Sequence, residues 1–275
     1  MIKENDMIAL VCDLPERGLK QGQIGVVVMV HDSAGYEVEF VGPNGKTISV
    51  VTLSANFFRP ASTGEVFEFS NACIFQRRVA EIAITASLAR NQGFAGAVET
   101  LRRFAAKIDL SEFALQQTEP DFLCLLDKRT AELQQALKDC RAEKSDARAD
   151  NPDLWGLARK ALNVFLCEAF FHRILHRCYG LQTLGPWLEV PLDSQTYTAI
   201  RRKASKLGLR GRRNDLPFKF TIGGLSKDTS MRAQELAKLI AEKEHLPLRI
   251  YFEIATWRAS GAEMETVQEG FIPGV

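Results

Sequence analysis

The pattern of apolar and polar positions divides the chain into two parts. Up to about residue 60, apolar residues occur in short runs that are typical of strands. Ile24–Val30 is rich in β-branched residues, and residues 36–40 alternate strictly, with apolar side chains on one face. Residues 46–53 form a further run after the turn 42–45, whose glycines and asparagine tolerate positive φ. Short strands at this spacing predict a small barrel or rolled sheet over residues 1–62.

From about residue 70 the apolar residues recur at helical spacing. Ile74, Val79 and Ile82 begin this pattern, which continues towards the C-terminus. Residues 142–152 contain no apolar side chain larger than alanine or proline, which indicates an exposed loop. We therefore predict an α+β chain in which an all-α domain, 70–275, follows the β module. Helices are expected over 72–91, 96–108, 123–141, 153–177, 193–207, 229–245 and 248–259.

The charge is balanced overall but not along the chain. The 275 residues carry 35 basic and 34 acidic side chains, for a formal net charge of +1, which excludes a uniformly basic nucleic-acid coat. Residues 1–60 have a net charge of −2, so the helical part has +3. Cations are concentrated between 201 and 219, where only Asp215 opposes them, and such a stretch suits contact with a phosphate backbone. The cations there are Arg201, Arg202, Lys203, Lys206, Arg210, Arg212, Arg213 and Lys219.

Six scattered cysteines form no C-x-x-C pair, so we expect neither a zinc site nor an iron–sulfur cluster, and no cofactor. Thiols of this kind fit a reducing cytoplasm. No apolar stretch reaches the length of a membrane span, and the first ten residues lack a signal peptide's apolar core. We therefore predict a cytoplasmic protein with no membrane partner.

Two segments carry a resemblance to a known family. Residues 154–166 read LWGLARKALNVFL, and residues 188–200 read LEVPLDSQTYTAI. The first resembles the hairpin and following helix of helix-hairpin-helix DNA glycosylases, and the second resembles the stretch with their catalytic aspartate. The resemblance implies that Lys160 is a Schiff-base nucleophile and that Asp193 is the catalytic carboxylate. Gly156 takes the place of the first hairpin glycine, and Ala158 replaces the second.

A third segment resembles the archaeal 8-oxoguanine glycosylase branch of that family. Residues 246–257 read LPLRIYFEIATW and are similar to its late helix. The resemblance implies that Glu253 and Trp257 line a base pocket, where Trp187 is a further aromatic candidate. The implied partner is double-stranded DNA with a damaged or modified base. The expected DNA contacts are Gly156, Ala158, Arg159, Arg201, Arg202, Lys203, Arg210, Arg212 and Arg213.

These residue types suit base excision. Breaking a glycosidic bond develops positive charge on the sugar, which a carboxylate stabilises. A lysine that attacks C1′ must be neutral, so it needs burial or cationic neighbours such as Arg159. The target base must also leave the helical stack and enter a pocket.

Two other interpretations stay open. The same residues are typical of an exposed helix lysine at Lys160 and an ordinary N-cap at Asp193. The helical part would then be a catalytically inactive DNA-binding or protein-interaction module with a role in defence or regulation. Alternatively, Glu168, His172 and His176 lie at i, i+4 and i+8 of one predicted helix, where they would support a metal-dependent enzyme.

The β module carries a resemblance of its own. Its turn motifs, including 18–25 (GLKQGQIG), are similar to a small bacterial SH3-like domain family of unknown function. The resemblance implies a barrel over residues 1–60. Because this module is net negative, a protein partner suits it better than DNA does.

Overall fold

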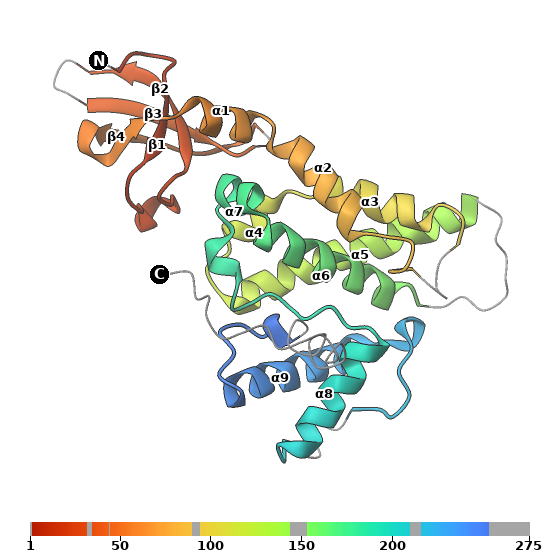
Figure 1. The fold of residues 1–275 in the computed structure, drawn as a ribbon. Coiled ribbons are helices and arrows are strands. Elements are labelled where there is room, and N and C mark those ends of the chain that lie inside the picture. The colour runs from red at the N-terminus through yellow and green to blue at the C-terminus, as the bar shows by residue number, and fades with distance from the viewer. Residues whose placement is uncertain are drawn as a thin grey trace, which may run out of the picture.

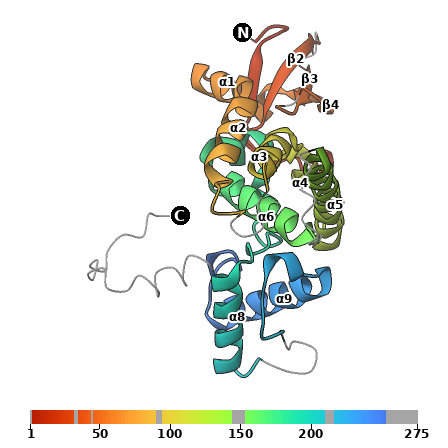
Figure 2. The same cartoon turned by 90° about the vertical axis from the view of Figure 1, so that its right-hand side faces the viewer.

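The computed structural model describes residues 2–31, 35–43, 45–89, 94–143, 153–209 and 216–252. Its described residues form a β module followed by helices (Figure 1). The predicted α+β layout is therefore confirmed. The turned view shows three stacked parts: the β module, a middle group of helices, and the pair α8 and α9 (Figure 2). Each part has its own hydrophobic core.

The β module is a five-stranded antiparallel sheet with the order β4-β3-β2-β1-β5. Its strands β2, β3 and β4 follow one another as hairpins, and β5 returns to pair with β1. The predicted runs 24–30 and 36–40 lie in strands, and the run 46–53 does so from Thr47 onwards. The bounds are β1 Met7–Leu10, β2 Ile24–Val30, β3 Gly35–Val41, β4 Thr47–Ser54 and β5 Phe58–Pro60.

The core of the sheet explains one glycine in β2. Val38 and Phe40 of β3 are buried and pack across the position of Gly25. A Cβ atom at Gly25 would lie 2.6 Å from Cγ1 of Val38 and 2.9 Å from the Phe40 ring. Glycine is therefore required here by the close approach of β3 side chains.

A short helix, α1 (Thr63–Ser70), follows the last strand, where the sequence pattern predicted none. Ser62 caps it, and Glu65 completes a capping box by accepting from the Ser62 backbone N–H at 2.8 Å. Arg59 of β5 donates to both carboxylate oxygens of Glu65, at 2.7 and 2.9 Å. This pair ties the sheet to the helical part.

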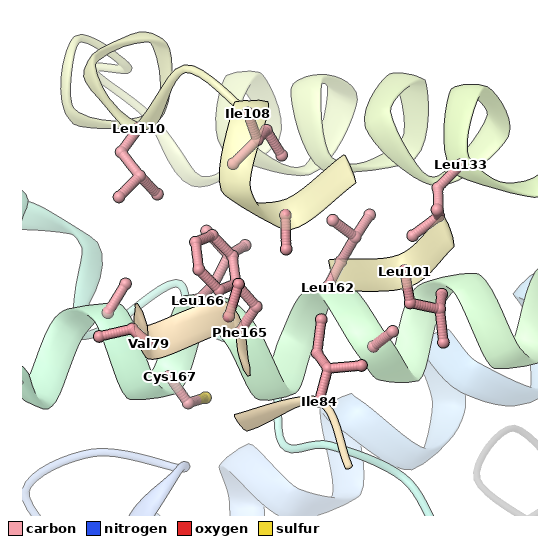
Figure 3. Packing of buried hydrophobic residues seen from close by; sticks show 14 of the residues in the cluster. Val79, Ile84, Leu101, Ile108, Leu110, Leu133, Leu162, Phe165, Leu166 and Cys167 are labelled. Atoms are coloured by element: carbon pink, nitrogen blue, oxygen red, sulfur yellow. The ribbon is translucent and has the colours of Figure 1, made fainter. Parts of the chain in front are cut away.

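The remaining helices form two groups. The central cluster comprises α2 to α7, whose buried side chains include Leu101, Leu162 and Phe165 (Figure 3). The C-terminal cluster comprises α8 and α9, around Tyr197 and Ile240. The bounds are α2 Ala72–Ala83, α3 Ala97–Lys107, α4 Leu110–Ala114, α5 Glu119–Glu143, α6 Trp155–Phe171, α7 Arg173–Tyr179, α8 Ser194–Lys206 and α9 Lys227–Lys243.

Several helix predictions need correction. The helix expected over 72–91 ends at Ala83, and the helix expected to begin at 123 begins at Glu119. The helix expected over 153–177 breaks at His172, which ends α6 and caps α7. Residues 253–259 lie outside the described residues. The domain limits 1–62 and 70–275 stay predictions.

Ion pairs connect the β module to the central cluster. Lys46, between β3 and β4, lies 3.1 Å from Asp109 at the N-cap of α4. Glu68 of α1 accepts from Arg173 of α7 at 3.0 Å and also pairs with Arg177. In the described ranges, no helix is both long and apolar enough to cross a membrane.

The Arg59–Glu65 pair gives a pH-dependent prediction. The hydrogen bonds from Arg59 and the capping hydrogen bonds at Ser62 lower the pKa of Glu65 to about 2, although partial burial opposes them. A depressed carboxyl pKa contributes stability above the ordinary pKa of 4.5, and this stability is lost as the pH falls towards 2. Glu65→Gln keeps the capping box, so its free energy of unfolding should depend less on pH in that window. Parallel unfolding curves for the two proteins between these pH values would contradict this assignment.

Candidate functional site

An extended segment, residues 188–193, passes between the two helical clusters (Figure 1). Leu188 belongs to the central core, whereas Val190 and Leu192 belong to the C-terminal core. The side-chain amide of Gln234 in α9 satisfies both backbone groups of Val190, at 2.9 and 2.8 Å. We call this junction of α6, residues 188–193 and the C-terminal cluster the seam.

A buried ion pair fixes the segment to α6. Arg159 donates through Nε and Nη2 to the two oxygens of Glu189, at 2.8 and 2.9 Å, and both residues are only 4% exposed. The Arg159 Nη1 atom also donates to Asp127 at 2.8 Å and to Thr130 at 3.1 Å. Asn163 donates to Glu189 at 2.9 Å. This bidentate geometry with additional hydrogen bonds is what a buried ion pair needs to offset desolvation.

The pKa shifts agree with this geometry. Burial alone would raise the pKa of Glu189, but the Arg159 charge and the hydrogen bonds from Arg159 and Asn163 bring it below the ordinary value. Burial opposes the charge of Arg159, yet Glu189 and Asp127 raise its pKa. Both groups are therefore charged at neutral pH.

This network corrects the role predicted for Arg159. Its guanidinium is buried and engaged by two carboxylates, so contact with a DNA phosphate would require breaking the pair. We therefore reassign Arg159 from DNA contact to the positioning of residues 188–193.

The predicted hairpin residues lie at the start of α6. Gly156 and Ala158 are buried in its first turn, and their contact with DNA stays a prediction. A Cβ atom at Gly156 would lie 2.1 Å from the carbonyl oxygen of Ile222 and 3.0 Å from Cβ of Leu225. Gly156 therefore permits the close approach of α6 to the 3-10 helix Ile222–Gly224.

Lys160 lies on the face of α6 that is turned towards the seam. In an α-helix, positions i−4, i+3 and i+7 share a face with position i. For Lys160 these are Gly156, Asn163 and Cys167. Asn163 contacts Glu189 through its amide, and the Cys167 Sγ atom lies 3.6 Å from the Glu189 carbonyl oxygen. Lys160 itself is partly buried.

Asp193 lies at the end of the same extended segment, four residues after Glu189. Its side chain accepts from the Thr196 backbone N–H at 2.8 Å and so caps α8. Like Lys160, it is partly buried. The two residues thus come from elements that contact each other, although a shared pocket stays a prediction.

The predicted cations of α8 differ in whether their side chains already have a partner in the protein. Lys203 pairs with Glu244 at 2.6 Å, and Arg201 lies 4.8 Å from the centre of the Phe218 ring. Arg202 and Lys206 are exposed. Arg210, Arg212 and Arg213 lie outside the described residues.

The base-pocket prediction is testable here only at Trp187. Its ring is partly buried in the central cluster, 6.1 Å from the ring of Phe122. This placement is that of a packing residue. Glu253 and Trp257 lie outside the described residues.

The predicted metal-binding face is wrong. Because α6 ends before His172, Glu168, His172 and His176 do not share one continuous helix. The Nδ1 atom of His172 accepts from the Leu175 N–H at 3.4 Å, and that of His176 lies 2.7 Å from the Phe170 carbonyl. Among the described residues, no group of three such side chains is placed to hold a metal ion.

A cleft of about 660 Å³ lies elsewhere, between α3, α5 and the β-module residue Lys46. Its walls carry both signs of charge, including Arg103, Arg129, Glu112 and Asp139. None of the predicted site residues that the structure describes lines it, so the seam and the cleft are separate features.

Sequence reasoning missed the network that organises the seam. The available signal was Glu189 within the apolar run LEVPL, since a carboxylate among buried residues needs a partner. Its partner Arg159 lies 30 positions earlier, and nothing local identifies it.

One family model matches the chain. It describes a domain of unknown function (DUF4926) and covers residues 4–60, which is the β module. This agrees in extent with the predicted domain of unknown function, and it does not extend to the helical part. No curated protein and no solved structure matches the sequence. The glycosylase resemblance of the helical part therefore stays a prediction.

The Arg159–Glu189 pair predicts a large mutational effect. Glu189→Gln should lower the free energy of unfolding by about 3 kcal/mol, because it leaves a buried guanidinium undercompensated. Glu132→Gln is the matched control, because Glu132 pairs with Arg129 at 2.7 Å but is 39% exposed. That variant should lose no more than about 0.5 kcal/mol in denaturant unfolding. Equal losses in the two variants would contradict the role given to the buried pair.

The contact at Gly156 predicts a contrast between two glycines. Gly156→Ala should destabilise the protein by about 1–3 kcal/mol, since the new methyl group meets backbone. Gly64→Ala, within α1, has nothing within 4 Å of the new Cβ and should be neutral or stabilising. Thermal unfolding of both variants checks this, and an undisturbed Gly156→Ala protein would show that α6 does not pack here as described.

Proposed function

We propose that the helical part is a DNA glycosylase with AP-lyase activity, which excises a damaged or modified base from double-stranded DNA. Lys160 is the proposed Schiff-base nucleophile, and Asp193 is the proposed catalytic carboxylate. The observation that supports this best is the position of Lys160 on the face of α6 that meets the segment leading to Asp193.

In the proposed chemistry, Asp193 and Lys160 each have one role at the sugar. The carboxylate of Asp193 stabilises positive charge at C1′ as the glycosidic bond lengthens. The Lys160 amine forms a bond to C1′ while the C1′–N bond breaks, and the base leaves with a proton. Opening of the sugar ring then gives an imine between Nζ and C1′, which borohydride reduces to a stable amine.

Binding to DNA would depend on exposed cations of the C-terminal cluster rather than on Arg159. Arg202, Lys206 and Lys219 are exposed, and they belong to α8 and the chain that follows it. A small number of phosphate contacts implies modest affinity that falls as salt is raised.

The β module is proposed to be an SH3-like barrel that binds a protein partner. Its strand order, a three-strand meander whose neighbour β1 pairs with the returning β5, supports this identity. A cytoplasmic location is likewise proposed, and the six free cysteines support it.

A second candidate is a DNA-binding protein without catalysis. It needs only the exposed cations of α8 and of the chain after it, and it does not need a phosphate-binding surface beside Lys160, which the burial of Gly156, Ala158 and Arg159 disfavours. The two candidates differ in whether a covalent intermediate forms.

Borohydride trapping on duplexes that carry an abasic site or 8-oxoguanine separates them. The wild type should form a protein–DNA adduct, and Lys160→Ala and Lys160→Arg should form none, because neither side chain gives an imine. Asp193→Asn should trap at least about tenfold less while keeping its fold, since asparagine also caps a helix. Lys138→Ala, on the exposed face of α5, is the matched lysine control and should trap like the wild type.

An adduct that persists in Lys160→Ala would remove Lys160 from the mechanism. DNA binding by the wild type without any adduct or base release would favour the non-catalytic candidate.

A further inference from the structure

A single phenylalanine projects from the chain that follows α8. Phe218 is 83% exposed, whereas Leu216 two positions before it is 3% exposed. Phe220 two positions after it stacks on the buried ring of Tyr197, with 4.4 Å between ring centres. The exposed aromatic ring therefore lies between two anchored neighbours, which is unlike a freely moving loop tip.

The backbone at Phe218 is held by α8. The Tyr197 hydroxyl donates to the Pro217 carbonyl at 3.0 Å, and Arg201 Nη1 donates to the Phe218 carbonyl at 3.3 Å. The Arg201 guanidinium also lies 4.8 Å from the centre of the Phe218 ring. The ring is thus presented from a fixed backbone with a cation against it, and most of its surface is left to solvent.

Two cations adjoin this ring: Arg201 lies against it, and exposed Lys219 follows it in sequence. Arg202 and Lys206 are further exposed cations of α8. Between residues 194 and 225 the sequence has one acidic residue, Asp215, which lies outside the described residues. Glu244, directly after α9, is engaged by Lys203 at 2.6 Å. A ligand that carries both negative charge and an unstacked aromatic ring fits this surface.

We propose that Phe218 is a stacking residue for an unpaired nucleobase, with the nearby cations contacting the adjoining phosphates. Base–aromatic stacking beside a cationic surface is how proteins hold single-stranded or unstacked nucleotides. The proposal rests on the proposed function in taking DNA as the partner. It adds a stacking contact that lies apart from Lys160 and Asp193.

Binding to a short single-stranded DNA that contains 2-aminopurine tests this contact, with a perfectly paired duplex as comparison. The wild type should quench 2-aminopurine fluorescence, and Phe218→Ala should bind the single strand about 10- to 100-fold more weakly. Phe218→Trp should restore both readouts. Phe67→Ala is the matched control, because Phe67 lies on α1 and is also exposed, at 60%.

The proposal is wrong if Phe218→Ala and Phe67→Ala bind the single strand like the wild type, or if the wild type does not bind it. It is also wrong if Phe218→Ala changes only self-association in sedimentation, which would assign the ring to a protein contact. Quenching that depends on Phe218 without any trapped adduct supports this proposal and counts against the proposed catalysis. If Phe218→Ala forms the adduct like the wild type and binds the single strand unchanged, the stacking proposal is wrong and the proposed catalysis is supported.

Discussion

The buried ion pair between Arg159 and Glu189 is the constraint on which the arrangement of the helical part depends. Removing two charges from water costs several kcal/mol per ion, so the pair persists only where its geometry is complete. That geometry requires α6, α5 and the extended segment to meet at one place, because Asp127 of α5 also contacts Arg159. Lys227 at the start of α9 reaches the same Asp127 at 2.5 Å, which extends the network to the C-terminal cluster. A second buried arginine, Arg249, donates to the Leu188 carbonyl at 2.7 Å.

This constraint links stability to the proposed function. The same segment that is held through Glu189 continues to Asp193, and the same turn of α6 that holds Arg159 carries Lys160. A variant that loosens the pair should therefore affect both the fold and the orientation of the seam. The price of this arrangement is that Arg159, although basic and next to the proposed nucleophile, is not free for DNA. In the proposed function, the positive charge that contacts DNA comes from side chains that the network does not use, such as Arg202 and Lys219.

Local patterns in the sequence predicted the elements better than their connections. The strand at Ile24–Val30 and the helices near 96–108 and 193–207 follow from period and turn residues alone. The break at His172 did not, since neither proline nor glycine marks it and the apolar pattern continues through it. Gly156 matched a hairpin glycine by position. Glycine is needed there, however, because the carbonyl oxygen of Ile222, 66 residues later, approaches it closely. The role of Arg159 was missed for the same reason: its partners are distant in sequence, and charge pairing across elements has no local signature.

We propose that DNA binds at the seam, and not at the cleft beside α3 or on the outer face of the sheet. Hydrogen–deuterium exchange with and without an abasic-site duplex tests it most directly. Amide exchange should slow in residues 188–200 and 216–221, while exchange in β2 to β4 and in α3 stays unchanged. Protection confined to the β module or to α3, or no change anywhere on adding the duplex, would contradict the claim.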